Sequence, residues 1–375
     1  MPTKLFDTAI IGGGLSGLAL SILLSKAGKE VVLFEKENYP FHKVCGEYIS
    51  NESVPFLKSL GTDLESQNLP QMNKLFLTSP SGISIIRNLD IGGTGLSRYH
   101  LDDQLYHLAL SAGVKVLTNT KVHQVTFMDN NFIVNTSDSI YNSRTVAGAY
   151  GKNSSIDVQL NRNYKAKNDS KLFVAVKHHI RAEYDYKRVE IHNFPGGYCG
   201  FSAIDDGMVN MSYISKAVNL KKSGSIDKME KNILSTNPYL KKYFENADFI
   251  SPKPLTISHL YFGIKQSVTD HILMLGDAAG NIAPFSGNGM SMALKSSKLA
   301  SEVILSYLKN EITLDEMDRL YTKNYNQSFA KRINVARQIN SLLGNAILTD
   351  VGFCFLKVFP GMIDILSKRV HGDIF

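Results

Sequence analysis

The first forty residues carry the hydrophobic pattern of a strand, a helix and a second strand. The largely apolar runs Thr8–Ile11 and Val31–Phe34 predict buried strands. Between them, residues 15–27 predict a helix, and Gly28 is typical of the position that ends one. The pattern indicates one supersecondary unit of an α/β domain.

The middle of the chain follows the two-residue period of β-strands instead. Phe76–Asn88, with the turn Ser79–Gly82, predicts a hairpin. Apolar residues alternate through residues 171–192, and Met208–Ile214 follows the turn Asp205–Gly207 as a partner strand. We therefore expect an antiparallel sheet in this part of the chain.

Helical patterns fill most of the rest. Residues 98–112, 216–243 and 291–305 predict helices, and the tail after about residue 311 is mostly helical. His271–Leu275 predicts another buried strand ahead of the third of these helices.

The composition is that of a globular protein. The chain has 375 residues, of which 43% are hydrophobic and 20% charged, values that exclude collagen-like, coiled-coil and disordered classes. Three scattered cysteines, Cys45, Cys199 and Cys354, fit neither a disulfide framework nor a clustered zinc site. We expect no metal and a cytoplasmic location, since the N-terminus also lacks a signal-peptide pattern.

The net charge of +7 raises the question of an anionic partner. Many lysines fall between Lys216 and Lys242, where acidic residues are interleaved with them, as on a solvated helix face. We therefore expect no nucleic-acid partner. The apolar stretch Val351–Leu366 contains Lys357 and Pro360 and is too interrupted to span a membrane, although it can lie on one.

A glycine-rich turn joins the first strand to its helix. Gly12, Gly14 and Gly17 fill the pattern G-x-G-x-x-G, and Glu35 ends the second strand about 20 residues later. The first glycine permits the tight turn, the second lets the backbone approach a diphosphate, and the third lets the helix pack against the strand. The acid suits a free ribose 2′-hydroxyl, so the pattern predicts FAD or NAD.

A second glycine-rich segment favours the flavin over NAD. After the predicted strand come Gly276-Asp277, Pro284 and Gly287-Asn288-Gly289-Met290, and then a helix. Asp277 is suited to accept hydrogen bonds from ribityl hydroxyls. A helix N-terminus at the pyrimidine edge of a flavin stabilises the negative charge that the ring gains on reduction.

Together these motifs resemble those of a known flavoprotein superfamily. The residues that carry the resemblance are Gly12-x-Gly14-x-x-Gly17 with Glu35, Arg98-x-x-Leu101-Asp102, Gly276-Asp277, Pro284 and Gly287-x-Gly289. The superfamily is the FAD-dependent group of para-hydroxybenzoate hydroxylase, geranylgeranyl reductases and flavin halogenases. Lys43-Val44-Cys45-Gly46-Glu47 and Gly197-Tyr198-Cys199-Gly200-Phe201 are most similar to the geranylgeranyl reductase branch, which reduces isoprenoid double bonds.

The resemblance implies a discontinuous Rossmann-like FAD-binding domain, an inserted antiparallel β-sheet substrate domain and a helical C-terminal tail. The expected division is residues 1–70, 98–160 and 260–310 for the FAD-binding domain, 71–97 and 161–259 for the substrate domain, and 311–375 for the C-terminal region. No flavinylation motif is visible, so we expect non-covalent FAD. The residues expected to bind it are Gly12, Gly14, Ser16, Gly17, Glu35, Lys36, Lys43, Arg98, Gly276, Asp277, Pro284, Gly287, Asn288, Gly289 and Met290.

The chain also departs from the superfamily. Where the hydroxylases carry an Asp-Gly pair that touches FAD and the pyridine nucleotide, this chain has Tyr150-Gly151. The reductase branch and the tryptophan halogenases carry tryptophan-containing motifs, but this chain has no tryptophan. We therefore expect either NADH or NADPH as a transient electron donor or a partner protein that supplies the electrons.

Three residues are the candidates for chemistry. Cys45 lies between Lys43 and Glu47, where a nearby cation can favour a thiolate, and the resemblance places it near the flavin ring. Glu47 is a candidate proton donor or a partner of Lys43. Tyr198 is a candidate pocket residue or hydrogen-bond donor. The structural alternatives are a buried thiol, an ion pair and a packed ring.

These observations predict a FAD-dependent oxidoreductase that reduces a carbon–carbon double bond of a hydrophobic, isoprenoid- or polyketide-like small molecule. The alternatives are a flavin monooxygenase that hydroxylates an aromatic ring and a flavin-binding redox partner without catalysis. The apolar stretch from Ile347 to Leu366 indicates either a helix packed against the FAD-binding domain, which we favour, or peripheral contact with a membrane or lipid.

Overall fold

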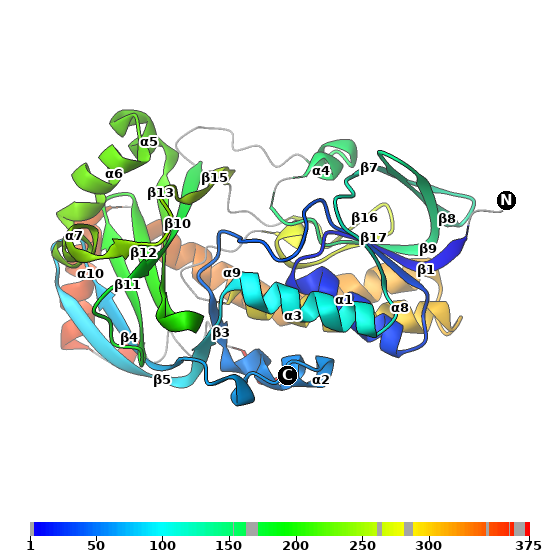
Figure 1. The fold of residues 1–375 in the computed structure, drawn as a ribbon, viewed down its shortest axis with the longest axis horizontal. Coiled ribbons are helices and arrows are strands. Elements are labelled where there is room, and N and C mark those ends of the chain that lie inside the picture. Colours follow the sequence, from blue (N-terminus) through cyan, green and yellow to red (C-terminus); the bar gives the residue numbers. More distant parts are fainter. Residues whose placement is uncertain are drawn as a thin grey trace.

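The structure, a computed structural model, describes residues 4–152, 154–162, 172–260, 265–280, 288–342, 345–359, 361–363 and 372–375. Figure 1 shows two β-sheets toward opposite ends of an elongated molecule, with long helices running between and beneath them.

The first sheet is built around the N-terminal unit and is mostly parallel. β1 (Leu5–Ile11) lies between β2 (Val31–Phe34) and β9 (Ile140–Gly148) and runs parallel to both. The other strands of this sheet are β6 (Lys115–Leu117), β7 (Val122–Met128), β8 (Asn131–Thr136), β16 (Val268–Thr269) and β17 (Ile272–Met274). The predicted N-terminal strands and the predicted strand ahead of Gly276 are thereby confirmed.

Helix α1 (Leu15–Lys26) follows the glycine turn, as predicted, and is buried along most of its length. Its residues are nearly all small or apolar because α3 (Arg98–Ser111) and α8 (Gly289–Leu308) both pack against it. α9 (Leu314–Leu342) packs on α8, so the region after residue 311 is helical as expected. Two shorter helices of this half of the molecule are α2 (Val54–Leu60) and α4 (Ser155–Gln159).

The second sheet comes mainly from the middle of the chain. Its strands in spatial order are β14 (Asp248–Phe249), β10 (Phe173–Arg181), β13 (Val209–Lys216), β12 (Gly197–Ala203), β11 (Arg188–Phe194), β4 (Gln71–Thr78), β5 (Ser84–Gly95) and β3 (Tyr48–Ser50), with β15 (Leu255–Leu260) also paired to β10. Neighbouring strands are antiparallel except β4 and β11, which are parallel. The predicted hairpin is confirmed in β4 and β5. β3 comes from the stretch assigned to residues 1–70 yet pairs with β5, and the division into domains stays a prediction.

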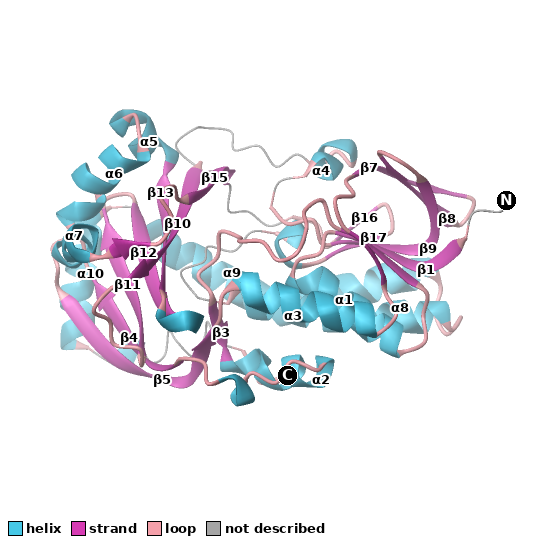
Figure 2. Ribbon diagram, viewed as in Figure 1, coloured by secondary structure: helices cyan, strands magenta, loops and turns pink. Residues whose placement is uncertain are grey.

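The two faces of the second sheet differ in what covers them. A group of short helices covers the outer face (Figure 2), namely α5 (Ala217–Ser223), α6 (Ile226–Asn232) and α7 (Pro238–Asn246). Val176 and Cys199 pack beneath these helices, whereas their neighbours Ala175 and Tyr198 belong to an apolar cluster on the opposite face. This alternation follows from the two-residue period of a strand.

The apolar C-terminal stretch does not pack where we expected. α10 (Ala346–Val358) lies on the second sheet rather than on the FAD-binding half, with Phe353 packed against Leu77 and Ile85 of β4 and β5. The hairpin presents apolar side chains on its inner face, and α10 removes them from water. Within the described ranges, no helix is both long enough and apolar enough to cross a bilayer.

The close approach of α1 to β1 makes Gly17 a sensitive position. A Cβ atom at Gly17 would lie 2.0 Å from the carbonyl oxygen of Gly12, so the helix would have to move away from the turn. We expect Gly17→Ala to lower the free energy of unfolding of the FAD-free protein by about 1–3 kcal/mol in urea titrations. At Gly14 the nearest described atom would be 3.7 Å away, and Gly14→Ala is therefore the matched control, with unchanged stability of the FAD-free protein. Equal losses in both variants would contradict this explanation.

Candidate active site

A cavity of about 1290 Å³ lies between the glycine turn and the second sheet. On one side its lining includes Gly14, Glu35 and Arg98, and on the other it includes Tyr198 from β12 and Phe353 from α10. Residues far apart in the sequence therefore share one space, whose two sides differ in chemistry.

The glycine turn forms the polar side of this cavity. Gly14 caps the N-terminus of α1 without any side-chain capping bond, so the backbone N–H groups of the first turn face the cavity. The carboxylate of Glu35 accepts a hydrogen bond from the N–H of Gly13 at 2.9 Å, and Tyr39 donates to the carbonyl of Gly13 at 2.5 Å. The N–H and the carbonyl of Gly13 are thus both held by side chains, and Glu35 is almost fully buried.

Two cations converge on the same place. Arg98 donates two hydrogen bonds to the buried carboxylate of Asp102, at 2.7 and 2.6 Å, and the ammonium of Lys43 lies 3.0 Å from Asp102. Burial alone would raise the pKa of Asp102, but Arg98 and Lys43 together hold it below its usual value. One carboxylate and two cations leave a net positive charge beside Gly14. The sequence analysis named Asp102 in the motif Arg98-x-x-Leu101-Asp102 without giving it a role, and its role in placing Arg98 was missed.

The second glycine-rich segment lies beside the first turn of α1, since a Cβ atom at Gly276 would be 3.1 Å from the hydroxyl of Ser16. Asp277 is in a 3₁₀ turn, Gly276–Ala279, and its carboxylate is 3.8 Å from Lys152. Gly276, Asp277, Gly289 and Met290 line the cavity, as do Ser16 and the largely exposed Lys36. Asn288 is buried at the start of α8. Pro284 and Gly287 lie outside the described residues.

These residues fit a dinucleotide with a flavin. The uncapped helix N-terminus, the bare backbone of Gly14 and the net positive charge suit a diphosphate. Glu35 keeps lone pairs for ribose hydroxyls, and α8 begins at the cavity with its positive end. The roles of the individual cofactor-binding residues stay predictions.

Glu47 is a positioning residue in this structure and does not pair with Lys43, contrary to one of our expectations. Its carboxylate is fully buried and accepts hydrogen bonds from the ammonium of Lys177 at 2.5 Å and the backbone N–H of Arg98 at 2.8 Å. His179 lies 2.7 Å from its second oxygen. Burial raises the pKa of Glu47, but Lys177 and His179 outweigh it and lower the pKa overall. An ionised carboxylate with all its partners in place is not a ready proton donor.

The segment 43–47 is held against the second sheet by further bonds. Lys177 donates to the carbonyl of Lys43 at 3.1 Å, and Ser202 and Asn210 donate to the carbonyl of Gly46 at 2.6 and 2.9 Å. The Cys45 thiol in the middle of the segment lines the cavity and accepts the N–H of Glu47 at 3.5 Å. Burial lowers the pKa of Arg98, but Asp102 and, to a smaller extent, Cys45 raise it above its usual value, so the thiol and the guanidinium are neighbours.

Tyr198 lies on the inner face of β12, and its neighbour Cys199 lies on the outer one. Tyr198 belongs to the apolar cluster that includes Ala175 and Ile214 and lines the cavity. Burial raises its pKa well above the ordinary value, so the phenol stays protonated. Cys199 is fully buried beneath the outer helices and is excluded from the cavity.

Sequence reasoning missed Lys177 and His179, although the signal was present. Both are polar and two residues apart in β10, between Val176 and Ile180 of the buried outer face. Polar residues at alternate positions of a buried strand indicate a polar contact on the other face. His178 and His179 point to opposite faces of the sheet, since His178 bonds Glu230 at 2.9 Å whereas His179 bonds Glu47.

Tyr150 occupies the place of the acid that the hydroxylases carry. Its hydroxyl donates to Asp157 at 2.8 Å and accepts from Arg162 at 2.7 Å. Lys265 also bonds Asp157, at 2.7 Å. This ion cluster joins β9, α4 and the segment ahead of β16 along the edge of the cavity.

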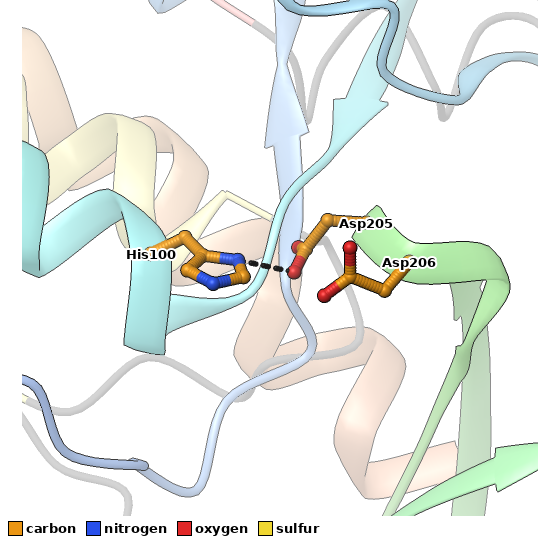
Figure 3. A group of neighbouring side chains, drawn as sticks. All are labelled: His100, Asp205 and Asp206. Atoms are coloured by element: carbon orange, nitrogen blue, oxygen red, sulfur yellow. Dashed lines mark hydrogen bonds and ion pairs between the residues drawn. The ribbon is translucent and has the colours of Figure 1, made fainter.

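A further contact between the two halves involves the start of α3. Figure 3 shows His100 beside Asp205, with Nδ1 2.5 Å from the carboxylate, and Asp206 next to them. Asp205 also accepts the backbone N–H of Ser97 at 2.5 Å. These bonds explain the position of Asp205, which accepts hydrogen bonds at the N-terminus of α3. We therefore assign no metal ion to His100, Asp205 and Asp206.

We call the polar side of the cavity, with Gly14, Glu35, Lys43 and Arg98, the nucleotide cradle. The fold and this cradle define a FAD-binding flavoprotein. A family model described as FAD binding domain matches residues 6–315, and the chain belongs to this family. The predicted superfamily, α/β fold class and non-covalent FAD are confirmed, and the chain is a FAD-dependent oxidoreductase.

The proteins to which this chain is similar have different names. Conditioned medium factor receptor 1 of Dictyostelium discoideum is 27% identical over 331 residues, which are 80% of this chain and 64% of the receptor. Digeranylgeranylglycerophospholipid reductase of Methanocaldococcus jannaschii is 26% identical over 350 residues, which are 85% of this chain and 83% of the reductase. The solved structure of a flavin-dependent brominase superposes with a TM-score of 0.79 at 18% identity and covers 98% of this chain and 93% of its own. At this identity, the similarity to the brominase supports the fold of this chain but not its reaction.

The contact at Gly14 yields a test of the cradle. The Cβ of Gly14→Ala would lie between the helix N-terminus and the two cations, 3.7 Å from Lys43 and 3.9 Å from Arg98. We expect the variant to fold normally but to bind FAD at least about tenfold more weakly, because a methyl group there blocks the approach of a diphosphate. Titration of apoprotein with FAD, followed by flavin fluorescence, measures this. Unchanged affinity would place the diphosphate elsewhere.

The lowered pKa of Glu47 yields a pH prediction. A carboxyl group whose folded pKa lies below its ordinary value of 4.5 contributes stability above that value, and the contribution is lost as the pH falls through the folded pKa. We expect Glu47→Gln to cost about 3 kcal/mol at pH 7, because Lys177 loses its buried counter-charge. The difference in the free energy of unfolding between Glu47→Gln and the wild type should narrow in urea titrations as the pH falls below 4.5.

The control is Glu30→Gln, which removes an exposed ion pair with Lys4 and should change little at any of these pH values. If the difference in the free energy of unfolding between Glu47→Gln and the wild type stays constant with pH, the ionised carboxylate is not the source of the stability.

Proposed function

We propose that the protein reduces a carbon–carbon double bond of a long hydrophobic substrate of the isoprenoid class. The observation that carries the proposal is the composition of the cavity wall opposite the nucleotide cradle. It is formed by aliphatic and aromatic side chains of the second sheet, of α10 and of the chain just beyond α10, namely Leu75, Leu77, Leu89, Val189, Ile191, Ile214, Ile257, Phe353, Leu356 and Ile363. Such a wall binds an apolar chain by removing it from water.

Polar side chains such as Ser202, Ser212 and Thr256 also line the cavity, and two further lining residues are the candidates that the sequence indicated. Tyr198 stands within the apolar cluster, and Cys45 lies at the boundary between the wall and the cradle. Burial keeps the Tyr198 phenol protonated, so it can deliver a proton to a carbon centre or hold a substrate oxygen. Cys45, beside Arg98, is the alternative proton donor.

Bound FAD in its reduced form would supply the electron pair for such a reduction, and a nicotinamide or a partner protein would restore it. The chain's own part is to hold the substrate, to exclude water from the double bond and to supply one proton. Glu47 acts indirectly, since its bonds to Lys177 and Arg98 fix the segment that carries Cys45. The similarity to a protein named digeranylgeranylglycerophospholipid reductase supports the isoprenoid class.

Oxygen dependence tests the reaction type. Photoreduced holoenzyme is mixed anaerobically with a geranylgeranyl-bearing glycerophospholipid in detergent, and the product is examined by mass spectrometry for added hydrogen. We expect hydrogenated product without oxygen. An absolute need for oxygen would replace this function by that of a flavin monooxygenase, and absence of any turnover by FAD-loaded protein would favour a non-catalytic redox partner.

The tyrosine is tested in the same assay. We expect Tyr198→Phe to lower kcat about 10²-fold or more, with a smaller change in KM, because it removes the proton donor but leaves the ring that packs against the substrate. Tyr186→Phe is the matched control, since the hydroxyl of Tyr186 bonds the carbonyl of Gly207 outside the cavity. If Tyr198→Phe keeps full activity and Cys45→Ser does not, the thiol is the donor.

A further inference from the structure

Helix α10 has an apolar face on each of two sides. Toward the protein, Gly352, Phe353 and Leu356 line the cavity. Away from it, Ile347 and Val351 have exposed fractions of 75% and 61%. The outward side chains continue along the helix and just beyond it with Phe355, Val358, Phe359 and Met362, of which Val358 is 70% exposed.

The spacing shows that these residues form one stripe. Positions 347, 351, 355 and 358 are four, four and three residues apart, which places them on the same side of an α-helix. The rings of Phe355 and Phe359 are 4.8 Å apart and extend the stripe past the end of α10. Isolated exposed apolar residues are ordinary, but a contiguous stripe of this kind marks a contact surface.

The charges beside the stripe are few, and they are unequally placed. Of the described residues in α10, Asp350 and Lys357 are charged, and Asp350 is turned to the β4–β5 turn, where it accepts bonds from the backbone and hydroxyl of Ser81. Lys357 is exposed in the last turn, next to the stripe. The charge that the stripe offers to a partner is therefore positive, and the whole chain carries +7.

We propose that this stripe docks α10 onto the surface of a phospholipid bilayer that contains anionic lipid. A helix with a strong apolar face and a neighbouring lysine lies in the interfacial plane of such a membrane. A second copy of the chain fits less well, because stable protein interfaces use about 20–30 residues from each partner and the stripe is one helix wide.

Docking has a consequence for the cavity that rests on the proposed function. Since the inner face of α10 is part of the cavity wall, its outer face on the bilayer brings that end of the cavity to the acyl region. An apolar substrate chain then reaches the cavity without crossing water. The docking itself does not depend on what reaction follows.

Vesicle binding by the FAD-loaded full chain tests the proposal. We expect co-sedimentation with vesicles of phosphatidylcholine and phosphatidylglycerol, and weaker binding to phosphatidylcholine alone. Val351→Glu with Val358→Glu should weaken binding at least about tenfold, because charges replace two valines that the bilayer would otherwise cover. The matched control is Met128→Glu with Ile140→Glu, which changes two similarly exposed apolar residues of the first sheet and should leave binding unchanged.

The absence of tryptophan offers a second measurement. Phe355→Trp adds a single reporter to the stripe, and its emission should shift to the blue on addition of anionic vesicles, whereas Met128→Trp should not respond. This fluorescence measurement does not depend on whether the two glutamate variants fold.

Three results would overturn the docking proposal. The first is that wild-type protein stays in the supernatant with both kinds of vesicle. The second is that Val351→Glu with Val358→Glu does not weaken vesicle binding, and the third is that light scattering shows a dimer that this double variant dissociates. Vesicle binding without turnover would refute the proposed function only, and turnover in detergent without vesicle binding would refute the docking only.

Discussion

The arrangement of the site depends on one buried carboxylate. Glu47 belongs to the segment after β2, yet its oxygens are bound by Lys177 and His179 of β10 and by the backbone of Arg98 at the start of α3. A buried charge is tolerated only when its partners stay in place, so this group fixes the relative position of three separate parts of the chain. The interaction sets where Cys45 and Arg98 stand relative to the second sheet.

The cradle and the substrate wall use opposite physical means. Around Gly14, backbone N–H groups and two cations set against Asp102 create a place for negative charge. Across the cavity, β-strands with a two-residue period present aliphatic side chains to the same space. Under the proposed function, the flavin and an apolar substrate would meet where these two surfaces adjoin, and Cys45 lies at that boundary.

α10 connects this cavity to the outside of the molecule. It covers the inner face of the β4–β5 hairpin, with Phe353 against Leu77 and Ile85, and still exposes an apolar stripe. The position of the helix follows from the apolar face of the hairpin, which would otherwise be open to water.

The sequence alone determined the local units and the cofactor class. The strand, glycine turn, helix and acid of residues 8–35 lie within one short stretch, so their geometry follows from local backbone requirements such as the space that Gly17 must leave for Gly12. Contacts between distant segments could not be predicted, because residue types do not state which partner a charge will find across more than a hundred positions. Glu47 therefore looked like a partner of Lys43, and the apolar tail looked like a helix for the FAD-binding half. Only the tertiary structure paired Glu47 with Lys177 and placed α10 on the second sheet, since burial and the supply of counter-charges are decided when the two sheets come together.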